Sequence, residues 1–437
     1  MSDELLAIAD RVVAMAKPGE QVEAVVVRGT ETEIKVFGGD VESLSSAQSQ
    51  GVGIRIVVDG RQGFAYAGSL DESAIAETLA DARDNVSFAT FDEFAGLAEP
   101  DGVAIPVLDL HRDAMASFST SDKIAMAIEL ERVVMAADPR ISGIESAEYA
   151  DSISEAAIAT STGIRTVGSD TSCYVATYAM ASEGDETQTG FGFAVGREPF
   201  DLNPSRAALD AASRATRMLG AVQPPSGRLT VVLDPWVTAQ FLGILGYTLD
   251  GESVLKGRSL FAERLGESVG SSLLTLIDDP TDVRSFSATD ADGEGLAARR
   301  NVLIENGVLQ QFVHNAYSAR RAGTVSTGNA VRGFKSTPSV GCLSVSLMPG
   351  ISDPAALIAG IDDGVLVQEV SGLHSGVNPV SGDFSTGAEG LRIRNGELAE
   401  PVREFTIAST LQKMLRDVQA VGNDLEFLPM NASGVSL

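Results

Sequence analysis

Five β-patterned runs follow one another between two helical patterns in the middle of the chain, at residues 143–152, 154–161, 163–169, 173–182 and 187–195. The helices are expected at about 121–137, ended by Asp138-Pro139, and at 203–219. A row of strands flanked by helices is typical of an α+β unit. This stretch therefore predicts one such unit at residues 116–222.

A similar order of helix, strands and helix precedes this unit in the chain. Residues 3–16 have a helical spacing of apolar side chains that stops at Pro18-Gly19, and β-patterned runs follow at 22–27, 33–37, 53–58 and 63–67. Asp59-Gly60 between two of these runs predicts a hairpin with a type I′ turn. A helix at 70–85 completes a first unit at residues 1–86, and 87–115 is expected to be a connector. The shared order raises the hypothesis of an internal duplication, which the two sequences are too dissimilar to establish.

The last part, residues 226–437, is richer in strands than in helices. A strand at 229–233 leads through Asp234-Pro235 into an apolar helix that ends at the acidic loop Asp250-Gly251-Glu252. Asn306-Gly307 and Asn395-Gly396 predict two further hairpins. The predicted fold class is thus α+β: two N-terminal α+β units, with mixed strands and flanking helices, followed by a β-rich C-terminal domain.

Charge and cysteine usage exclude several classes of function. With 32 basic and 60 acidic residues the net charge is −28, which opposes binding to nucleic acid or to anionic membranes. Asp3 and Glu4 stand where a signal peptide needs positive charge, and the longest apolar run, 237–249, is too short to span a bilayer. Two distant cysteines, Cys173 and Cys342, form no disulfide framework. We expect a soluble cytoplasmic protein.

Few residues offer catalytic chemistry. Of the three histidines, His111 and His314 are interpreted as structural or surface residues, and no pair has the spacing of a zinc site. His374 lies in a Gly/Ser-rich stretch within ten residues of Ser375 and Asp383. These three residues are either a nucleophilic triad or, more simply, part of a structural turn, because a triad is defined by geometry and not by sequence proximity.

The acidic loop also has two interpretations. Asp250 and Glu252, with Lys256 nearby, are suited to acid/base chemistry or to binding a cation. In so acidic a chain, however, such a pair also occurs by chance as a solvated loop after a helix. Gly-rich pieces lack the strand and helix of a phosphate-binding loop.

Three stretches together resemble the TldD/PmbA (TldE) family: residues 375–411 (SGVNPVSGDFSTGAEGLRIRNGELAEPVREFTIASTL), 418–427 (VQAVGNDLEF) and 242–253 (LGILGYTLDGES). The resemblance in overall order runs from about residue 22 to the end of the chain, and it is most specific in the C-terminal block. It implies a heterodimeric zinc metalloprotease. In that family the TldD-type subunit carries an HExxxH helix and a downstream cysteine ligand, and the PmbA/TldE-type subunit lacks these ligands.

Comparison with the family motif HExxxHGLEGD places Leu242 and Tyr247 at the histidine positions and Gly243 at the glutamate. Residues 249–252, LDGE, match LEGD with the two acidic types exchanged, and no cysteine follows Cys342. Leucine, glycine and tyrosine do not form a zinc shell. The resemblance therefore implies a PmbA/TldE-type chain with no cofactor of its own, and zinc is expected in a TldD-like partner.

The expected function is a non-catalytic subunit of a peptidase acting on peptides or unfolded proteins. It would form a heterodimer with a TldD-like subunit, or self-associate as a homodimer. Tyr247, Asp250, Glu252, His374 and Asp383 are the candidates to face the peptide cavity. Two alternatives remain open: a stand-alone hydrolase that uses the His374 loop, and a homodimeric binding or scaffold protein.

Overall fold

The first two units are built in the same way, each with a helix, three strands and a second helix. The computed structural model describes residues 2–437. The elements of the N-terminal half are α1 (Ser2–Ala14), β1 (Gln21–Phe37), β2 (Asp40–Val58), β3 (Arg61–Ala67), α2 (Glu72–Phe88), α3 (Asp113–Ser117), α4 (Thr120–Ala137), β4 (Ile141–Thr160), β5 (Arg165–Glu183), β6 (Glu186–Gly196), the 3₁₀ turn η1 (Pro199–Asp201) and α5 (Pro204–Arg217).

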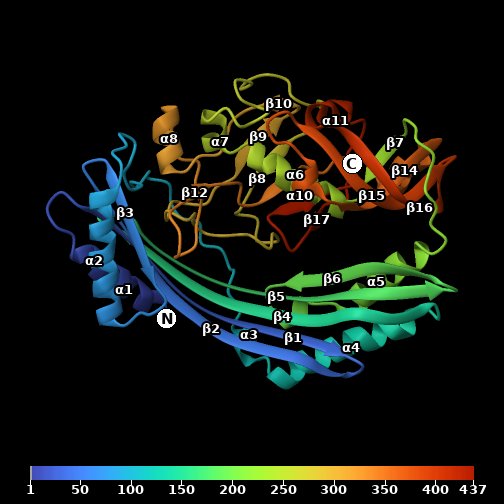
Figure 1. The fold of residues 1–437 in the computed structure, drawn as a ribbon, viewed down its shortest axis with the longest axis horizontal. Helices are drawn as coiled ribbons and strands as arrows, with labels where there is room; N and C mark the ends of the chain where they lie inside the picture. Colours follow the sequence, from blue (N-terminus) through green and yellow to red (C-terminus); the bar gives the residue numbers. More distant parts are fainter. Residues whose placement is uncertain (1) are drawn as a thin grey trace.

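The strands of both units join in one antiparallel sheet of order β3-β2-β1-β4-β5-β6. The two central strands, β1 and β4, pair from Glu23 opposite Thr160 to Val36 opposite Ala147, so the halves of the sheet are arranged alike on either side of this pair. This shared topology agrees with the duplication hypothesis. Figure 1 shows the long strands curving beneath the C-terminal domain.

The strands are longer than the sequence runs predicted. The runs at 22–27 and 33–37 are one strand, β1, and the four runs between 143 and 182 are the two strands β4 and β5. Residues 40–50, predicted as neither strand nor helix, form the exposed half of β2. That half is exposed on both faces, and it is a strand because its backbone pairs with residues 28–37 of β1.

Helices cover one face of this sheet. Leu5, Ile8 and Val12 of α1 are buried against Val22 and Ile54 of β1 and β2. At the other end α4 and α5 bury an alanine-rich surface with Leu130 and Tyr149. The opposite face of the sheet is thereby left to the C-terminal domain, which lies over it as a second layer (Figure 1).

The C-terminal domain is β-rich, as predicted. It contains a six-stranded sheet of order β10-β9-β8-β13-β18-β17, a four-stranded sheet of order β16-β15-β14-β7 and the small pair β11-β12. Its elements are β7 (Thr230–Leu233), α6 (Pro235–Thr248), α7 (Gly251–Leu255), β8 (Leu276–Asp278), β9 (Asn301–Glu305), β10 (Val308–Leu309), α8 (Ala316–Ala322), β11 (Ala330–Val331), β12 (Ser339–Val340), β13 (Val345–Leu347), α9 (Pro354–Ala359), β14 (Asp363–Ser371), α10 (Leu373–Gly376), β15 (Asp383–Arg394), β16 (Glu397–Thr410), α11 (Leu411–Asp417), β17 (Glu426–Phe427) and β18 (Ala432–Gly434).

The three predicted hairpin turns are confirmed by their backbone angles. Asp59, Asn306 and Asn395 have φ of 46°, 47° and 52°, and each is followed by a glycine of positive φ. Two consecutive residues of positive φ are the requirement of a type I′ turn, whose twist matches that of paired strands. Across residues 2–437, every helix is too short or too polar to cross a bilayer.

Candidate functional site

Helix α6 is the centre of the C-terminal domain, and its first residues explain why it begins where it does. The carboxylate of Asp234 accepts a hydrogen bond from the N–H of Val237 at 2.9 Å, and Pro235 occupies the first turn, where a missing N–H costs nothing. Phe241, Leu242 and Leu245 are buried in the main core. The helix contacts β13 and β18 of one sheet and β7 and β14 of the other.

The three motif positions on α6 point in different directions. Leu242 is 4% exposed and packs in the core, whereas Tyr247 is 73% exposed. Five residues turn an α-helix by about 140° beyond a full turn, which accounts for this difference. Because Leu242 and Gly243 have no donor atom and Tyr247 is directed to solvent, these positions do not fit a zinc site. Residues 2–437 contain no cluster of three or more His, Cys, Asp or Glu side chains placed to hold a metal ion.

The acidic segment after α6 is not a loop, which corrects that prediction: it starts the short helix α7. Asp250 caps this helix and accepts hydrogen bonds from the Glu252 N–H and the Ser253 hydroxyl, both at 2.8 Å. Burial raises the pKa of Asp250. Glu252 pairs with Lys256 one turn further on, at 2.6 Å. Both carboxylates thus have local structural roles.

Two buried side chains hold the α6–α7 corner in place. The ring of His314 lies directly on Gly251, where a Cβ would be 2.1 Å from the ring, and its Nδ1 is 3.0 Å from the Ser318 hydroxyl. Cys342 lies against Gly246 of α6. Burial raises the pKa of the Cys342 thiol well above its usual value, so the thiol stays protonated and a poor nucleophile. His314 is structural here, as its sequence context suggested.

The residues around His374 do not form a triad in this structure. His374 is an exposed residue of α10, and the Ser375 hydroxyl donates to the carbonyl of Gly372 at 3.3 Å. The carboxylate of Asp383 accepts from the Ser381 hydroxyl at 2.7 Å. Within residues 2–437 no hydrogen bond joins His374 to Ser375 or to Asp383. The Leu260 N–H donates to the Pro379 carbonyl at 3.0 Å, which ties this turn to the segment after α7.

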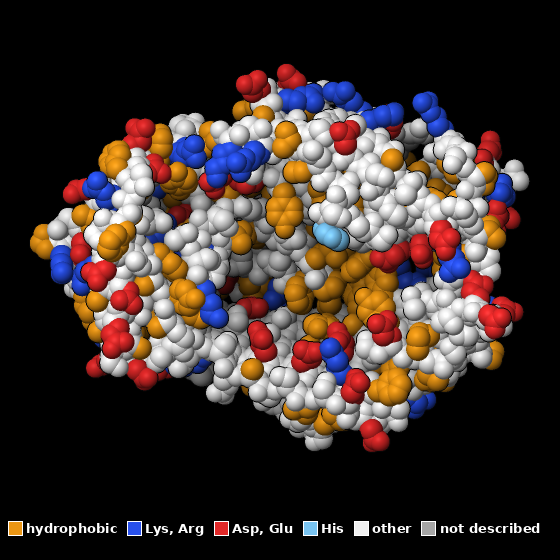
Figure 2. Space-filling model, viewed as in Figure 1, with side chains coloured by type: hydrophobic (Ala, Val, Ile, Leu, Met, Phe, Trp, Pro, Cys, Tyr) orange, Lys and Arg blue, Asp and Glu red, His pale blue; other side chains and the backbone are white. Residues whose placement is uncertain are grey.

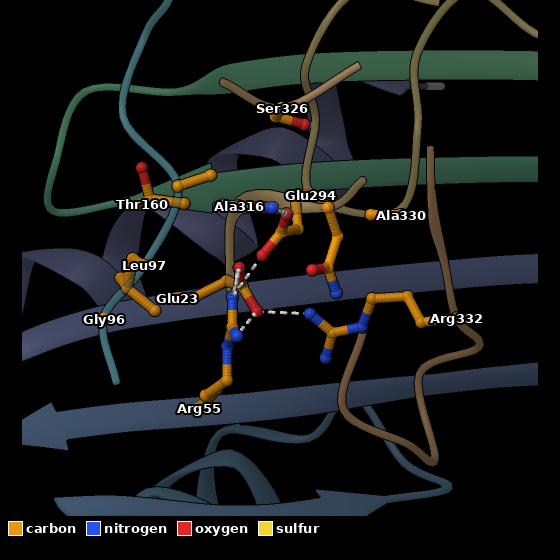
Figure 3. A network of polar contacts seen from close by, with 12 residues as sticks. Glu23, Arg55, Gly96, Leu97, Thr160, Glu294, Ala316, Ser326, Ala330 and Arg332 are labelled. Atoms are coloured by element: carbon orange, nitrogen blue, oxygen red, sulfur yellow. Dashed lines mark hydrogen bonds and ion pairs between the residues drawn. The ribbon is translucent and has the colours of Figure 1, made fainter. Parts of the chain in front are cut away.

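A buried ion network positions the C-terminal domain on the sheet (Figure 3). Arg55 of β2 forms a bidentate pair with Glu23 of β1, with contacts of 3.0 and 2.6 Å. From the C-terminal domain, Arg332 binds Glu23, and Glu294 approaches Arg55 to 3.5 Å and accepts the Ala316 N–H at 2.8 Å. Burial opposes ionisation of Glu23, but the two guanidinium groups outweigh it and lower its pKa.

A second contact between the layers was not predicted from the sequence. Trp236, the second residue of α6, packs on Phe191 and Phe193 of β6 at ring distances of 4.8 and 5.5 Å. A small pocket beside it is lined by Arg214 and Arg217 of α5 and by Glu369 of β14. These residues belong to elements far apart in the chain, so no local motif connects them. The one feature of the sequence that could have drawn attention to this contact is that Trp236 is the only tryptophan.

The fold and the family comparison together define the class of protein: an α+β chain that matches metallopeptidase domain models along most of its length and has a helical motif at the core of its β-rich domain. The family comparison is specific. The PmbA/TldA metallopeptidase domain 1 matches residues 22–86, the central domain matches 115–219 and the C-terminal domain matches 226–436. The chain belongs to the PmbA/TldD family.

Relatives support this assignment over nearly the whole chain. The metalloprotease PmbA of Escherichia coli O157:H7 is 28% identical over 405 residues, covering 92% of this chain and 88% of the relative. A metalloprotease of Methanothermobacter thermautotrophicus is also 28% identical, covering 90% and 86%. Among solved structures, a Thermotoga maritima protein superposes with a TM-score of 0.91 at 26% identity, covering 98% of this chain and 97% of that one. TldE from Thermococcus kodakarensis has the same fold, with a TM-score of 0.90 at 24% identity and coverage of 99% and 97%.

Proposed function

We propose that this chain is the non-catalytic subunit of a TldD/TldE-type zinc metalloprotease that acts on peptides or unfolded proteins. The metal is held by a TldD-like partner. The observation that carries this proposal is the state of α6: the helix is intact, yet its motif positions hold a core leucine, a glycine and a solvent-directed tyrosine. None of them supplies a zinc ligand or a general base for a metal-bound water.

In this proposal the chain contributes surface and shape. Tyr247, His374 and Asp383 are exposed, and Asp250 and Glu252 lie half-buried next to Tyr247 in the chain. These are the side chains that we expect to meet the partner or the peptide. Extended peptide can also add to the edge strand β7, because main-chain hydrogen bonds need no particular side chain. The outer side of β7 already bonds the backbone of Leu437 at Leu233, so the edge that a peptide would meet is Thr230–Val232.

The test is elemental zinc analysis of the purified chain, alone and co-purified with an HExxxH-bearing TldD-like protein. We expect almost no zinc in the chain alone and about one zinc per heterodimer, because only the partner offers a ligand set. About one zinc per isolated chain that survives dialysis would overturn the proposal.

Two further outcomes would contradict it in other ways. Peptidase activity from the isolated chain that His374→Ala abolishes would identify a stand-alone hydrolase. A stable homodimer in light scattering, together with no complex on mixing with the TldD-like protein, would identify a self-associating binding protein.

A further inference from the structure

Between the two layers lies a cavity of about 160 Å³, which we call the interdomain pocket. Its walls come from β5, β6 and α5 of the sheet layer and from α6, β14 and β15 of the C-terminal domain. Figure 2 shows the molecule hollowed between the layers, with hydrophobic side chains gathered inside the hollow. The pocket is smaller than the roughly 300–1,000 Å³ of sites for drug-sized ligands, so it suits a single residue or a terminal group.

One wall of the interdomain pocket is aromatic. Phe191 and Trp236 are in contact at 4.8 Å, and Tyr178 lies 6.2 Å from Phe191. An apolar side chain placed beside these rings would bury its surface against them, next to the Arg214 guanidinium that stacks on Phe191. The wall favours a ligand with an apolar side chain.

The opposite side of the interdomain pocket carries two arginines, of which only Arg214 has a direct ion pair. Arg214 stacks on Phe191 at 4.7 Å and lies 3.5 Å from the carboxylate of Asp234. Arg217 has no carboxylate within ion-pair distance in the part of the chain that the structure describes, and its Nε is buried without a hydrogen-bond partner. Burial, together with repulsion from Arg214, lowers the pKa of Arg217 to about 10. Asp234 and Asp210 attract Arg217 only from beyond ion-pair distance, so its desolvation is not offset by a direct carboxylate contact and the site is suited to an anionic ligand.

Two further polar atoms at the pocket lack partners. The indole Nε1 of Trp236 is a buried donor and the Oε1 of Gln368 is a buried acceptor, and neither has a hydrogen bond in the structure. Buried polar groups are nearly always paired, so such atoms mark places where water or a ligand completes the contacts. Both side chains line the pocket, so a rotation toward the cavity would present the Trp236 N–H as a donor to a carboxylate and the Gln368 Oε1 as an acceptor for an N–H, beside Arg217.

We propose that the interdomain pocket binds the carboxyl-terminal residue of a peptide. The α-carboxylate pairs with Arg217 and accepts from Trp236, the last amide N–H donates to Gln368, and an apolar side chain packs on Phe191. The choice of a peptide over a free amino acid rests on the proposed function, whereas the affinity for an α-carboxylate rests on the pocket alone.

The charges around the pocket argue against larger anions. Glu369 and Glu389 both line the pocket, and Asp234 already partly neutralises Arg214. A phosphate dianion would meet this negative charge, whereas a monoanionic carboxylate requires only one free guanidinium. Metal cations are disfavoured by the two arginines.

The full-length chain provides its own probe, because its only tryptophan is at the pocket. The experiment titrates N-acetyl-Ala-Ala-Ala-Leu with a free carboxyl group, the same peptide as a C-terminal amide, and free leucine, and it follows Trp236 fluorescence and calorimetry. We expect the free-acid peptide to shift the fluorescence and to bind at least about tenfold tighter than the amide, since a charge-assisted pair is lost with the amide. Equal binding of acid and amide, or no binding of either, would overturn the proposal. Free leucine that binds as tightly as the peptide would overturn the assignment to a peptide.

A variant pair locates the carboxylate. Arg217→Gln is expected to reduce affinity for the free-acid peptide by about tenfold or more and to abolish the preference over the amide. Arg206→Gln, on the exposed face of the same helix, is the control and should bind as the original chain does. An Arg217→Gln protein of unchanged melting temperature that still prefers the acid would refute the role of Arg217. These results need neither zinc nor a partner, so they are independent of the test of the proposed function.

Discussion

Asp234 connects the motif helix to the sheet layer through a single side chain. One carboxylate oxygen caps α6 at the Val237 N–H, and the other faces Arg214 of α5. Burial raises the pKa of Asp234 to about 6, so near neutral pH the carboxylate is ionised only because the cap and Arg214 compensate its desolvation. A substitution of Asp234 therefore affects both the cap of α6 and the ion pair with Arg214.

Asp234→Ala should lower the free energy of unfolding by about 1–3 kcal/mol, because α6 loses its cap and Arg214 loses its carboxylate. Asp234→Asn is the matched control: its amide oxygen can still accept from Val237, so a smaller loss is expected. The measurement is urea unfolding at pH 7.5. Equal losses in the two variants would show that the cap contributes nothing.

Glu369 gives a prediction that depends on pH. Burial raises its pKa from the usual 4.5 to about 7 in the folded chain. An acid with a raised folded pKa favours folding most below its unfolded pKa, and this contribution is lost as the pH rises through about 7. Glu369→Gln should therefore raise the melting temperature at pH 8 and leave it nearly unchanged at pH 5. The exposed Glu397→Gln is the control, and a Glu369→Gln gain that is equal at both pH values would contradict the assignment.

At the scale of elements, the strands β1 and β2 are held to the C-terminal domain by charge in a dry environment. The side chains of Glu23 and Arg332 are 0% and 2% exposed, and Glu23 also binds Arg55. Buried pairs contribute little net stability compared with an apolar replacement, but removal of one partner leaves an uncompensated charge. The network thus acts mainly as a constraint on how the layers fit.

Arg332→Ala should cost about 2–4 kcal/mol of unfolding free energy, less than the loss of a sole partner because Arg55 stays with Glu23. Arg28→Ala is the control, in the strand β1 that also contains Glu23: its pair with Glu4 has side chains 34% and 62% exposed, so a much smaller loss is expected. Chemical denaturation measures both. A similar cost for the two variants would mean that the burial of the network has no energetic consequence.

The elements also show what the sequence can predict. The turns at Asp59, Asn306 and Asn395 were predictable because the need for positive φ is local. The exposed half of β2 was not, since residues 40–50 bury almost nothing and owe their conformation to pairing with β1. The helix α7 was also missed: Asp250 caps it, but Gly251 directly after the cap made a loop the simpler prediction.

At the scale of the whole molecule, the C-terminal domain touches the curved sheet at several places, and besides the buried ion network two aromatic contacts lie at opposite edges of the sheet. One is the Trp236 contact with β6 beside the interdomain pocket. The other is the segment around Phe334, whose ring lies on Gly51 and packs edge-on against Tyr66 at 6.2 Å. Family resemblance located the motif helix from sequence, but the pocket joins residues from both layers, and nothing short of the folded arrangement brings them together.

These two contacts should open independently. Phe334→Ala removes the ring that covers Gly51, where the space is too tight for even a Cβ, and uncovers β2 at that position. We expect amide hydrogen exchange to rise in residues 51–56 and 330–340 and to stay unchanged in α6, because local openings involve only the contacts that are lost. Phe88→Ala, at an 87% exposed position of α2, is the control and should alter neither region. If exchange instead rises equally in α6, the C-terminal domain opens as one body. The Trp236 contact would then depend on the Phe334 contact, and the prediction of independent opening would be wrong.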